Sequence, residues 1–271
     1  MTARTPERIQ SRDNPLVKAL ARLARDPGAW RRQGRVWVEG DHLGRAALAR
    51  GWQPALGLFT ASGWAAAPEL LARAARRNLV LDDSLMAHVS GLKSPAPLAF
   101  VLDLPQERTL DPRAPTVVLD RVQDAGNVGS ILRSAAAFGF SQVVALKGTA
   151  LLWSPKVLRA GMGAHFGLRL VDGLEPRELD ALRLPWLATS SHQGEWLHRA
   201  HLPWPCAWVF GHEGQGVAAP LLARADQVLR IAQPGGEESL GVAAAAAICL
   251  HASAAALAAD AGAAAAPEPS L

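Results

Sequence analysis

The sequence predicts an α/β protein made of two domains, and three observations support this. Short apolar runs typical of buried strands recur along the chain, and segments with helical apolar spacing separate them. Strands that alternate with helices at this spacing are typical of an α/β layer. Prolines and mixed charges interrupt the pattern at 103–115, which indicates a linker. We therefore expect a smaller front domain over 1–102, a second domain over 116–260 and a disordered tail over 261–271.

The front domain is expected to begin with mobile residues, because residues 1–12 are polar and basic. Asn14 and Pro15 predict a helix start, since Asn suits the cap position and Pro the first helical position. Asp26-Pro27-Gly28 ends that helix. The apolar spacing predicts the remaining elements, which are strands at 36–38, 56–60, 79–81 and 98–102, and helices from Gly40 to about Arg50, at 69–77 and from 84 to 89.

In the second domain the alternation starts again and continues almost to the end of the chain. The predicted strands lie at 116–120, 142–146, 167–171, 186–189, 206–210 and 227–231. The predicted helices lie at 129–138, 155–161, 176–182, 217–224 and 239–258. The last helix is rich in alanine, which gives it a high intrinsic helix propensity.

Composition limits the class of protein. With 271 residues, 49% of them hydrophobic, the chain can bury a sizeable core. Its net charge of +4 permits a nucleic-acid partner without requiring one, and basic residues outnumber acidic ones near the start of the chain. The two cysteines give neither a disulfide framework nor a zinc pattern, so no metal is expected. Without a signal peptide or an apolar run of about 20 residues, we expect a cytoplasmic protein that does not enter a membrane.

One strand–loop–helix junction follows the linker. The strand that ends near Leu119 leads into a loop rich in Asp, Gly and Asn, and Asn127 and Arg133 lie where the next helix begins. Open α/β sheets bind ligands at such junctions, outside the carboxyl ends of their strands. Asn127 could equally be an ordinary helix cap and Arg133 a solvated helix arginine. A dinucleotide site is disfavoured, because the G-x-G-x-x-G fingerprint is missing.

Two more junctions of this kind occur later in the chain. Residues 209–217 combine a strand end with a Gly-rich loop that holds Glu213, which could form a charge-assisted bond to an arginine. Residues 231–245 combine a strand end, a Pro-Gly-Gly loop and a helix start that Ser239 or Glu238 could cap. Taken alone, the first could be a plain turn and the second an ordinary capped helix. Together, three Gly-rich junctions favour a site whose backbone groups read an adenine edge and hold a ribose.

The three stretches together resemble the SpoU (TrmH-like) family of RNA 2′-O-ribose methyltransferases in the SPOUT superfamily. The matching motifs, in the family's order within about 116–255, are Asn127-x5-Arg133, Gly211-x-Glu213-Gly214-x-Gly216, and Ile231 to Gly235 with Glu238-Ser239-Leu240. The segments Asn14 to Lys18 and Val38 to Gly40 resemble the substrate-binding domain often fused ahead of this catalytic domain. The resemblance implies a deep trefoil knot, a homodimer, and a pocket for S-adenosylmethionine built from the loops around 188–192, 211–216 and 231–242.

The resemblance also implies roles for individual residues. The catalytic group would be Asn127, Arg133, Glu213 and Ser239. The cofactor would be held at Thr189, Gly211, Glu213, Gly216, Ile231, Gln233 and Leu240. RNA phosphates would be held in the front domain by Arg12, Lys18, Arg22, Arg31, Arg32 and Arg35. Because an arginine is hard to deprotonate, we expect Arg133 to clamp an RNA phosphate and stabilise the developing alkoxide, oriented by Asn127 and Glu213.

The chain departs from the family pattern in the third motif and nearby. Gly241 stands where the family usually has Asn and Ala243 where it has Ser, while Ala125 replaces a common Pro and His212 a small residue. Either another side chain such as His212 compensates, or the activity is slow, or the protein binds RNA without methylating it. Among substrates, ribosomal RNA is expected first, because the front domain resembles those of ribosomal family members. Transfer RNA is the alternative.

Overall fold

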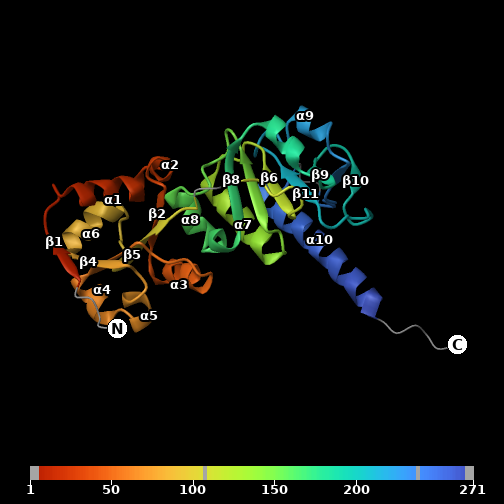
Figure 1. Cartoon of the computed structure of the whole chain (residues 1–271). Coiled ribbons are helices and arrows are strands. Elements are labelled where there is room, and N and C mark those ends of the chain that lie inside the picture. The colour runs from red at the N-terminus through yellow and green to blue at the C-terminus, as the bar shows by residue number, and fades with distance from the viewer. Residues whose placement is uncertain (1–5, 106–108, 236–238, 266–271) are drawn as a thin grey trace. The chain divides into compact units, whose positions relative to one another are not determined.

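A computed structural model describes residues 6–105, 109–235 and 239–265 (Figure 1). Its contacts divide the chain into two compact units, of which the first holds 1–107 with 153–167 and the second holds 108–152 with 168–271. The division near 107 falls inside the expected linker. The grouping of 153–167 with the first unit was not expected from sequence order. Aromatic packing accounts for it, since the ring of Trp52 lies 5.9 Å from Trp153 and 5.6 Å from Phe166, centroid to centroid.

The first unit is built on a mixed five-stranded sheet of order β1-β4-β3-β5-β2. Its strands are β1 (Glu7–Ile9), β2 (Arg35–Glu39), β3 (Leu56–Thr60), β4 (Arg77–Leu81) and β5 (Leu98–Asp103). Its helices are α1 (Pro15–Arg25), α2 (Ala29–Gln33), α3 (Asp41–Ala49), α4 (Ala61–Ala66), α5 (Glu69–Ala72), α6 (Asp83–Ser90), α8 (Pro155–Gly161) and the 3₁₀ helix η1 (Ala164–Gly167). Strands β1, β4 and β3 run parallel to one another, while β5 is antiparallel to β3 and β2.

The expectation of a mobile start is wrong for Glu7–Ile9, which pair in parallel with β4 and bury Ile9. An edge strand held by backbone bonds and one apolar side chain leaves little trace in hydropathy. Residues 1–5 lie outside the described residues. The start of α1 is confirmed, because Asn14 Oδ1 accepts the Leu16 N–H at 2.9 Å and Pro15 is the first helical residue.

The second unit is built on a seven-stranded sheet of order β10-β12-β9-β11-β6-β7-β8. Its strands are β6 (Thr116–Leu119), β7 (Gln142–Leu146), β8 (Arg169–Leu174), β9 (Trp186–Thr189), β10 (Glu195–Trp196), β11 (Ala207–Phe210) and β12 (Gln227–Arg230). Its helices are α7 (Ala125–Ala137), the 3₁₀ helix η2 (Pro176–Ala181), α9 (Ala219–Leu222) and α10 (Val242–Ala265). The predicted α/β fold is thus present.

Every neighbouring pair in this sheet is parallel, so the carboxyl ends of all its strands lie along one edge. The central strands β6, β7 and β11 are buried at every residue, as expected for strands covered on both faces. From β6 the chain proceeds outward through β7 to β8, and it then returns to the other side of β6 to form β9 and β11. The direction therefore reverses between β6 and β11, where open parallel sheets bind ligands.

Several helix boundaries differ from expectation. The helices expected at 69–77 and 217–224 are shorter, since α5 ends at Ala72 and α9 spans Ala219–Leu222. Helix α7 begins at Ala125, not at 129, because the Asp124 carboxylate caps it by accepting the Asn127 N–H at 2.9 Å. Helix α10 begins at Val242, and the Gly241 carbonyl accepts its first helical hydrogen bond. The helix continues to Ala265, past the predicted tail start, while residues 266–271 lie outside the described residues.

By length and composition, helix α10 is apolar enough over Val242–Asp260 to cross a membrane, with a mean hydropathy of 1.9. One side of the helix nevertheless packs within the second unit, against α7 and β11. Cys249 and Leu250 are buried there, and the Ser253 hydroxyl accepts the Trp208 indole N–H at 2.9 Å. We therefore treat α10 as a layer of the α/β fold.

Candidate active site

A cavity of about 360 Å³ lies at the carboxyl edge of β9, β11 and β12. The loops that follow these three strands line it, although they are far apart in the sequence. Sequence-predicted residues that line the cavity are Thr189, Gly211, Glu213, Gly216, Ile231, Gln233, Ser239 and Leu240. The second and third Gly-rich junctions thus line one cavity together with the loop after β9, and no residue of the first junction lines it.

The loop after β11 folds back on itself in a tight turn. His212 and Gly216 exchange two backbone hydrogen bonds of 3.0 and 2.8 Å, and Gly216 adopts φ +68°. A β-carbon on Gly211 would lie 2.0 Å from the Gly216 carbonyl carbon and 2.1 Å from the Val217 nitrogen. Glycine at 211 is therefore required by the close approach of two backbone segments.

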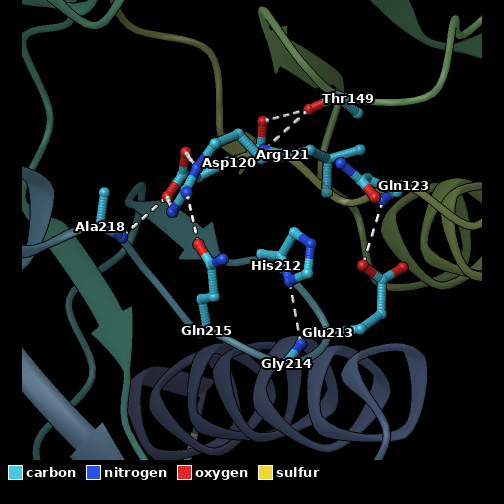
Figure 2. Close-up of polar contacts among 10 residues, drawn as sticks. Asp120, Arg121, Gln123, Thr149, His212, Glu213, Gly214, Gln215 and Ala218 are labelled. Carbon is cyan, nitrogen blue, oxygen red and sulfur yellow. Dashed lines mark hydrogen bonds and ion pairs between the residues drawn. The ribbon is translucent and has the colours of Figure 1, made fainter.

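Glu213 ties this loop to the loop after β6. Its carboxylate accepts hydrogen bonds from the Gln123 N–H at 3.1 Å, the Asp124 N–H at 3.0 Å and the Asn127 side-chain amide at 3.1 Å. Figure 2 shows the carboxylate turned toward Gln123. Burial alone would raise the pKa of Glu213, but these donors, with that of Asp124 first, lower the pKa to about 2. The group is an anion at neutral pH and a poor base.

The pH dependence of stability follows from this lowered pKa. Since the folded-state pKa of Glu213 lies below the ordinary value of 4.5, its contribution to the free energy of unfolding is complete above about pH 4.5 and is lost as the pH falls toward 2. We expect Glu213→Gln to lower stability at pH 7 by on the order of 1 kcal/mol. Thermal unfolding of both proteins across this pH range should show the difference shrinking toward pH 2. A difference that stays constant would contradict the assignment.

Asn127 lies in the first turn of α7, where its backbone N–H is capped by Asp124 and its side chain reaches Glu213. Interpreting Asn127 as the helix cap is therefore wrong, because the cap is three residues earlier. The side-chain amide instead joins the first junction to the second. The predicted meeting of an amide and a carboxylate from distant segments is present.

Arg133 lies six residues further along α7, about 9 Å along the helix axis. Its side chain is exposed and makes no hydrogen bond or ion pair with any described residue, so the expected contact with Asn127 or Glu213 is not formed. It belongs to an exposed stripe of α7 whose other members are Gly126, Ser130 and Ala137. The guanidinium is thus available to a ligand.

A second set of contacts joins the same two loops and was not expected from the sequence. Asp120 and Arg121, at the end of β6, bind Gln215 and Ala218 in the loop after β11 (Figure 2). The spacing of Asp120 and Arg121 gives no sign of a partner almost a hundred residues away.

The model of the SpoU rRNA methylase family matches residues 114–251. The chain belongs to this family. An uncharacterized tRNA/rRNA methyltransferase of Synechocystis is 32% identical over 252 residues, covering 90% of this chain and 92% of the relative. The 23S rRNA (guanosine(2553)-2′-O)-methyltransferase RlmP of Bacillus subtilis is 33% identical over 175 residues, covering 64% of this chain and 70% of its own.

Solved structures of the family share the fold. An RNA 2′-O ribose methyltransferase has a TM-score of 0.75 at 31% identity, covering 92% of this chain and 99% of that chain. A TrmH-family RNA methyltransferase described as putative, from Porphyromonas gingivalis, has a TM-score of 0.76 at 30% identity, covering 89% and 97%. An rRNA methyltransferase from Sinorhizobium meliloti, solved with AdoMet bound, has a TM-score of 0.77 at 24% identity, covering 91% and 97%, which shows likeness of fold.

The cavity suits the cofactor that the family motifs imply. The Gly-rich loops offer backbone donors and acceptors, and Leu222, Leu229 and Val242 add apolar walls. The side-chain oxygen of Gln233 is buried and has no hydrogen-bond partner within the described chain, so it can accept a bond from a ligand. Among the described residues, no cluster of His, Cys, Asp and Glu has the arrangement of a metal site.

Of the departures from the family pattern, only His212 lines this cavity. Its Nδ1 accepts the Gly214 N–H at 3.0 Å, so the neutral ring carries its hydrogen on Nε2 and can donate there. Ser239 lines the cavity without capping α10, because Gly241 occupies the cap position. A β-carbon added at Gly241 would have no heavy atom of the described residues within 4 Å, apart from its chain neighbours.

The six predicted RNA-binding residues differ in whether their side chains already have a partner in the protein. Three pair with acids, as Lys18–Asp13, Arg32–Asp26 and Arg35–Asp103. The Arg31 guanidinium lies over the Trp30 ring, 5.2 Å from its centroid. Arg12 and Arg22 are exposed and have no ion pair or hydrogen-bonded side chain in the described ranges. The free cations of this set are therefore these two.

Proposed function

We propose that this protein is a cytoplasmic enzyme that uses S-adenosylmethionine to methylate a ribose 2′-hydroxyl in a structured RNA, with ribosomal RNA as the first candidate. The observation that carries this proposal is the cavity lined by the predicted cofactor residues. The loop after β11 forms part of its wall, and Glu213 in that loop binds the Asn127 amide on the helix that bears Arg133. The names of relatives that act on ribosomal RNA support the substrate class. Transfer RNA is the second candidate, since the Synechocystis relative is named for both RNAs.

The bound cofactor would supply an electrophilic methyl group. Thr189, Gly211, Gly216 and Ile231 would hold it through the loops that line the cavity, with Gln233 as a side-chain acceptor. These residues would bind and orient the cofactor, and none of them has to move a proton.

The polar residues of the first junction would act on the RNA. Arg133 would bind a phosphate and stabilise negative charge on the attacking oxygen, since a guanidinium does not act as a base near neutral pH. Glu213 would stay ionised and hold Asn127 and the two loops in place, because its three donors lower its pKa to about 2. Ser239 would contribute a hydroxyl at the cavity rim.

A direct test uses purified protein, cofactor with a tritiated methyl group, and separate ribosomal and transfer RNA from cells that lack this protein. A 2′-O-methyl group blocks alkaline cleavage of the adjacent phosphodiester, so the label should be recovered in an alkali-resistant dinucleotide. Label in alkali-labile mononucleotides would contradict ribose methylation. Cofactor binding without transfer to either RNA would favour the alternative, a non-catalytic RNA-binding protein with this fold.

The Gly241 departure offers a way to test whether activity is reduced by the missing amide. We expect Gly241→Asn to be accommodated, because its β-carbon would meet no atom of the described residues within 4 Å and Asn caps helices at least as well as Gly. It should raise kcat a few-fold without lowering Tm, since it restores a polar group that the family usually has. Gly241→Ala is the matched control for the added β-carbon. An unchanged kcat with intact Tm would show that the amide is dispensable here.

The pairing pattern of the basic residues predicts which of them contribute most to RNA affinity. We expect Arg22→Ala to weaken RNA binding about three- to fivefold and to reduce the salt dependence by about one phosphate contact. Lys18→Ala, on the same helix but paired with Asp13, is the control and should have the smaller effect. Filter binding at several salt concentrations measures both. Equal effects would show that the ion pair opens at no cost when RNA binds.

We also propose that the protein is a homodimer. Helix α10 leaves apolar side chains in solvent, with Ile248 40% and Leu257 39% exposed, and its Ala244, Ile248, His251 and Ala255 lie on one exposed stripe. A second copy would cover that stripe. Sedimentation should give a dimer that Ile248→Glu converts to a monomer.

The deep trefoil knot is part of the same proposal. Strand β12 lies between β9 and β10, although both precede it in the chain. An arrangement in which a later strand enters between two earlier ones is what threading of the C-terminal segment would produce.

A further inference from the structure

We infer that Arg121 is a positioning residue that holds the loop 211–218 in its cavity-lining shape and thereby sets the affinity for the cofactor. The inference rests on the proposed function for the identity of that cofactor. Arg121 does not itself line the cavity, whereas Gln215, Gly216 and Val217 do. Its effect must therefore pass through the loop.

The backbone of Arg121 is held in an unusual conformation. Its φ is +60°, in the left-handed region that residues with side chains rarely adopt. The Arg121 N–H donates to the Thr149 hydroxyl at 3.0 Å, and that hydroxyl donates to the Leu119 carbonyl at 2.9 Å. Gly148 leaves room beside the side chain, since a β-carbon there would lie 3.1 Å from Arg121 Cγ. The surroundings thus fix where the guanidinium lies.

The guanidinium joins the end of β6 to the loop. Its Nε and Nη2 donate to the two oxygens of Asp120 at 2.9 and 3.2 Å, and its Nη1 donates to Gln215 Oε1 at 2.9 Å. Asp120, which is 3% exposed, also accepts the Ala218 N–H at 2.8 Å. Figure 2 shows this chain of contacts on the side of His212 away from Glu213.

The loop is therefore held at three points: Glu213 on one side, and Gln215 and Ala218 on the other. Charge-assisted bonds such as that from Arg121 to Asp120 are stronger than neutral ones and fix geometry. If the tie at Gln215 is removed, the loop gains conformations that cofactor binding must then restrict, and the affinity falls. In Arg121→Gly, turnover at saturating cofactor should change little, because Arg121 does not line the cavity and no group near the reacting atoms is removed.

The test uses Arg121→Gly, Gln215→Ala and the double variant of the full-length protein. Glycine at 121 removes the side chain and fits the positive φ, so it separates the tie from backbone strain. Arg113→Gly is the matched control, because Arg113 is an exposed arginine of the same unit whose side chain has no partner among the described residues. Calorimetry gives the Kd for S-adenosylmethionine, and amide hydrogen exchange reports opening of 211–218 in the cofactor-free protein.

We expect Arg121→Gly and Gln215→Ala each to raise Kd about fivefold and to speed exchange in 211–218. The Kd of the double variant should be little higher than that of either single variant, because both changes remove the same Arg121–Gln215 hydrogen bond. Gln215→Glu, which keeps an acceptor for Arg121, should retain the slow exchange of the wild-type loop.

An unchanged Kd and unchanged exchange in Arg121→Gly, or fully additive effects in the double variant, would overturn the inference. If Arg121→Gly fails to fold, Gln215→Ala and the Gln215→Glu comparison still decide the matter. A wild-type protein that binds no S-adenosylmethionine would refute the proposed cofactor, while the exchange measurement would still test the tie itself.

Discussion

Arg133→Ala should lower kcat for methyl transfer by about 10²- to 10³-fold, the usual cost of removing one group that stabilises developing negative charge. The Kd for S-adenosylmethionine and the Tm should stay at their wild-type values. Arg133 is exposed and bonded to nothing in the described part of the chain, so its removal breaks no contact of the fold. Single-turnover methylation with saturating RNA, run beside calorimetry and thermal unfolding, measures all three quantities.

Two further variants make this result specific. Arg133→Lys keeps the charge but loses the planar guanidinium, so it should recover only part of the activity. Arg113→Ala removes an equal charge from another exposed position of the second unit and should leave kcat unchanged. If Arg133→Ala retained wild-type turnover, Arg133 would not be the catalytic clamp and the proposed chemistry would need another residue.

Gly211→Ala should weaken binding of S-adenosylmethionine by on the order of 100-fold, because its β-carbon has no space. That carbon would lie 2.0 to 2.2 Å from backbone atoms of Gly216 and Val217. Backbone cannot rotate away as a side chain can, so the strand end and the loop must separate and the cavity wall moves. Calorimetry on the purified variant measures the loss, and a thermal melt shows whether the fold persists.

Gly214→Ala provides the matched control within the same loop. Its β-carbon would lie 3.8 Å from the nearest atom, the His212 ring nitrogen, which is an ordinary van der Waals distance. We expect cofactor affinity within about threefold of wild type, as for a surface change outside special features. Equal losses in the two variants would mean that the loop tolerates no side chain at either position, and the close-approach argument for Gly211 would be wrong.

The two sets of variants probe different parts of the site. The Gly211 comparison measures how the loop shapes a cavity, and the Arg133 comparison measures what the free guanidinium contributes to the reaction. Glu213 connects the two parts, since it belongs to the loop and binds the Asn127 amide on the helix that carries Arg133. If Arg133→Ala kept its kcat while Gly211→Ala lost affinity for S-adenosylmethionine, the protein would bind the cofactor without using Arg133 to transfer the methyl group.

The sequence by itself determined the α/β class and most elements of the second unit, because buried parallel strands such as β6 and β11 are continuous apolar runs. Glycine marked the strand ends where backbones approach closely. The resemblance of the motifs to a known family indicated eight of the residues that line the cavity. The sequence also determined the family, through an ordered set of three motifs that the family model matches over 114–251.

Only the tertiary structure decided which groups meet. Glu213 accepts hydrogen bonds from Gln123, Asp124 and Asn127, and Arg121 donates one to Gln215. Residues 153–167 belong to the first unit through aromatic contacts with Trp52. These contacts join residues that are many tens of positions apart, and their strength comes from distance and direction between side chains. Hydropathy and residue spacing along one chain carry information about local structure and burial, and none about those distances.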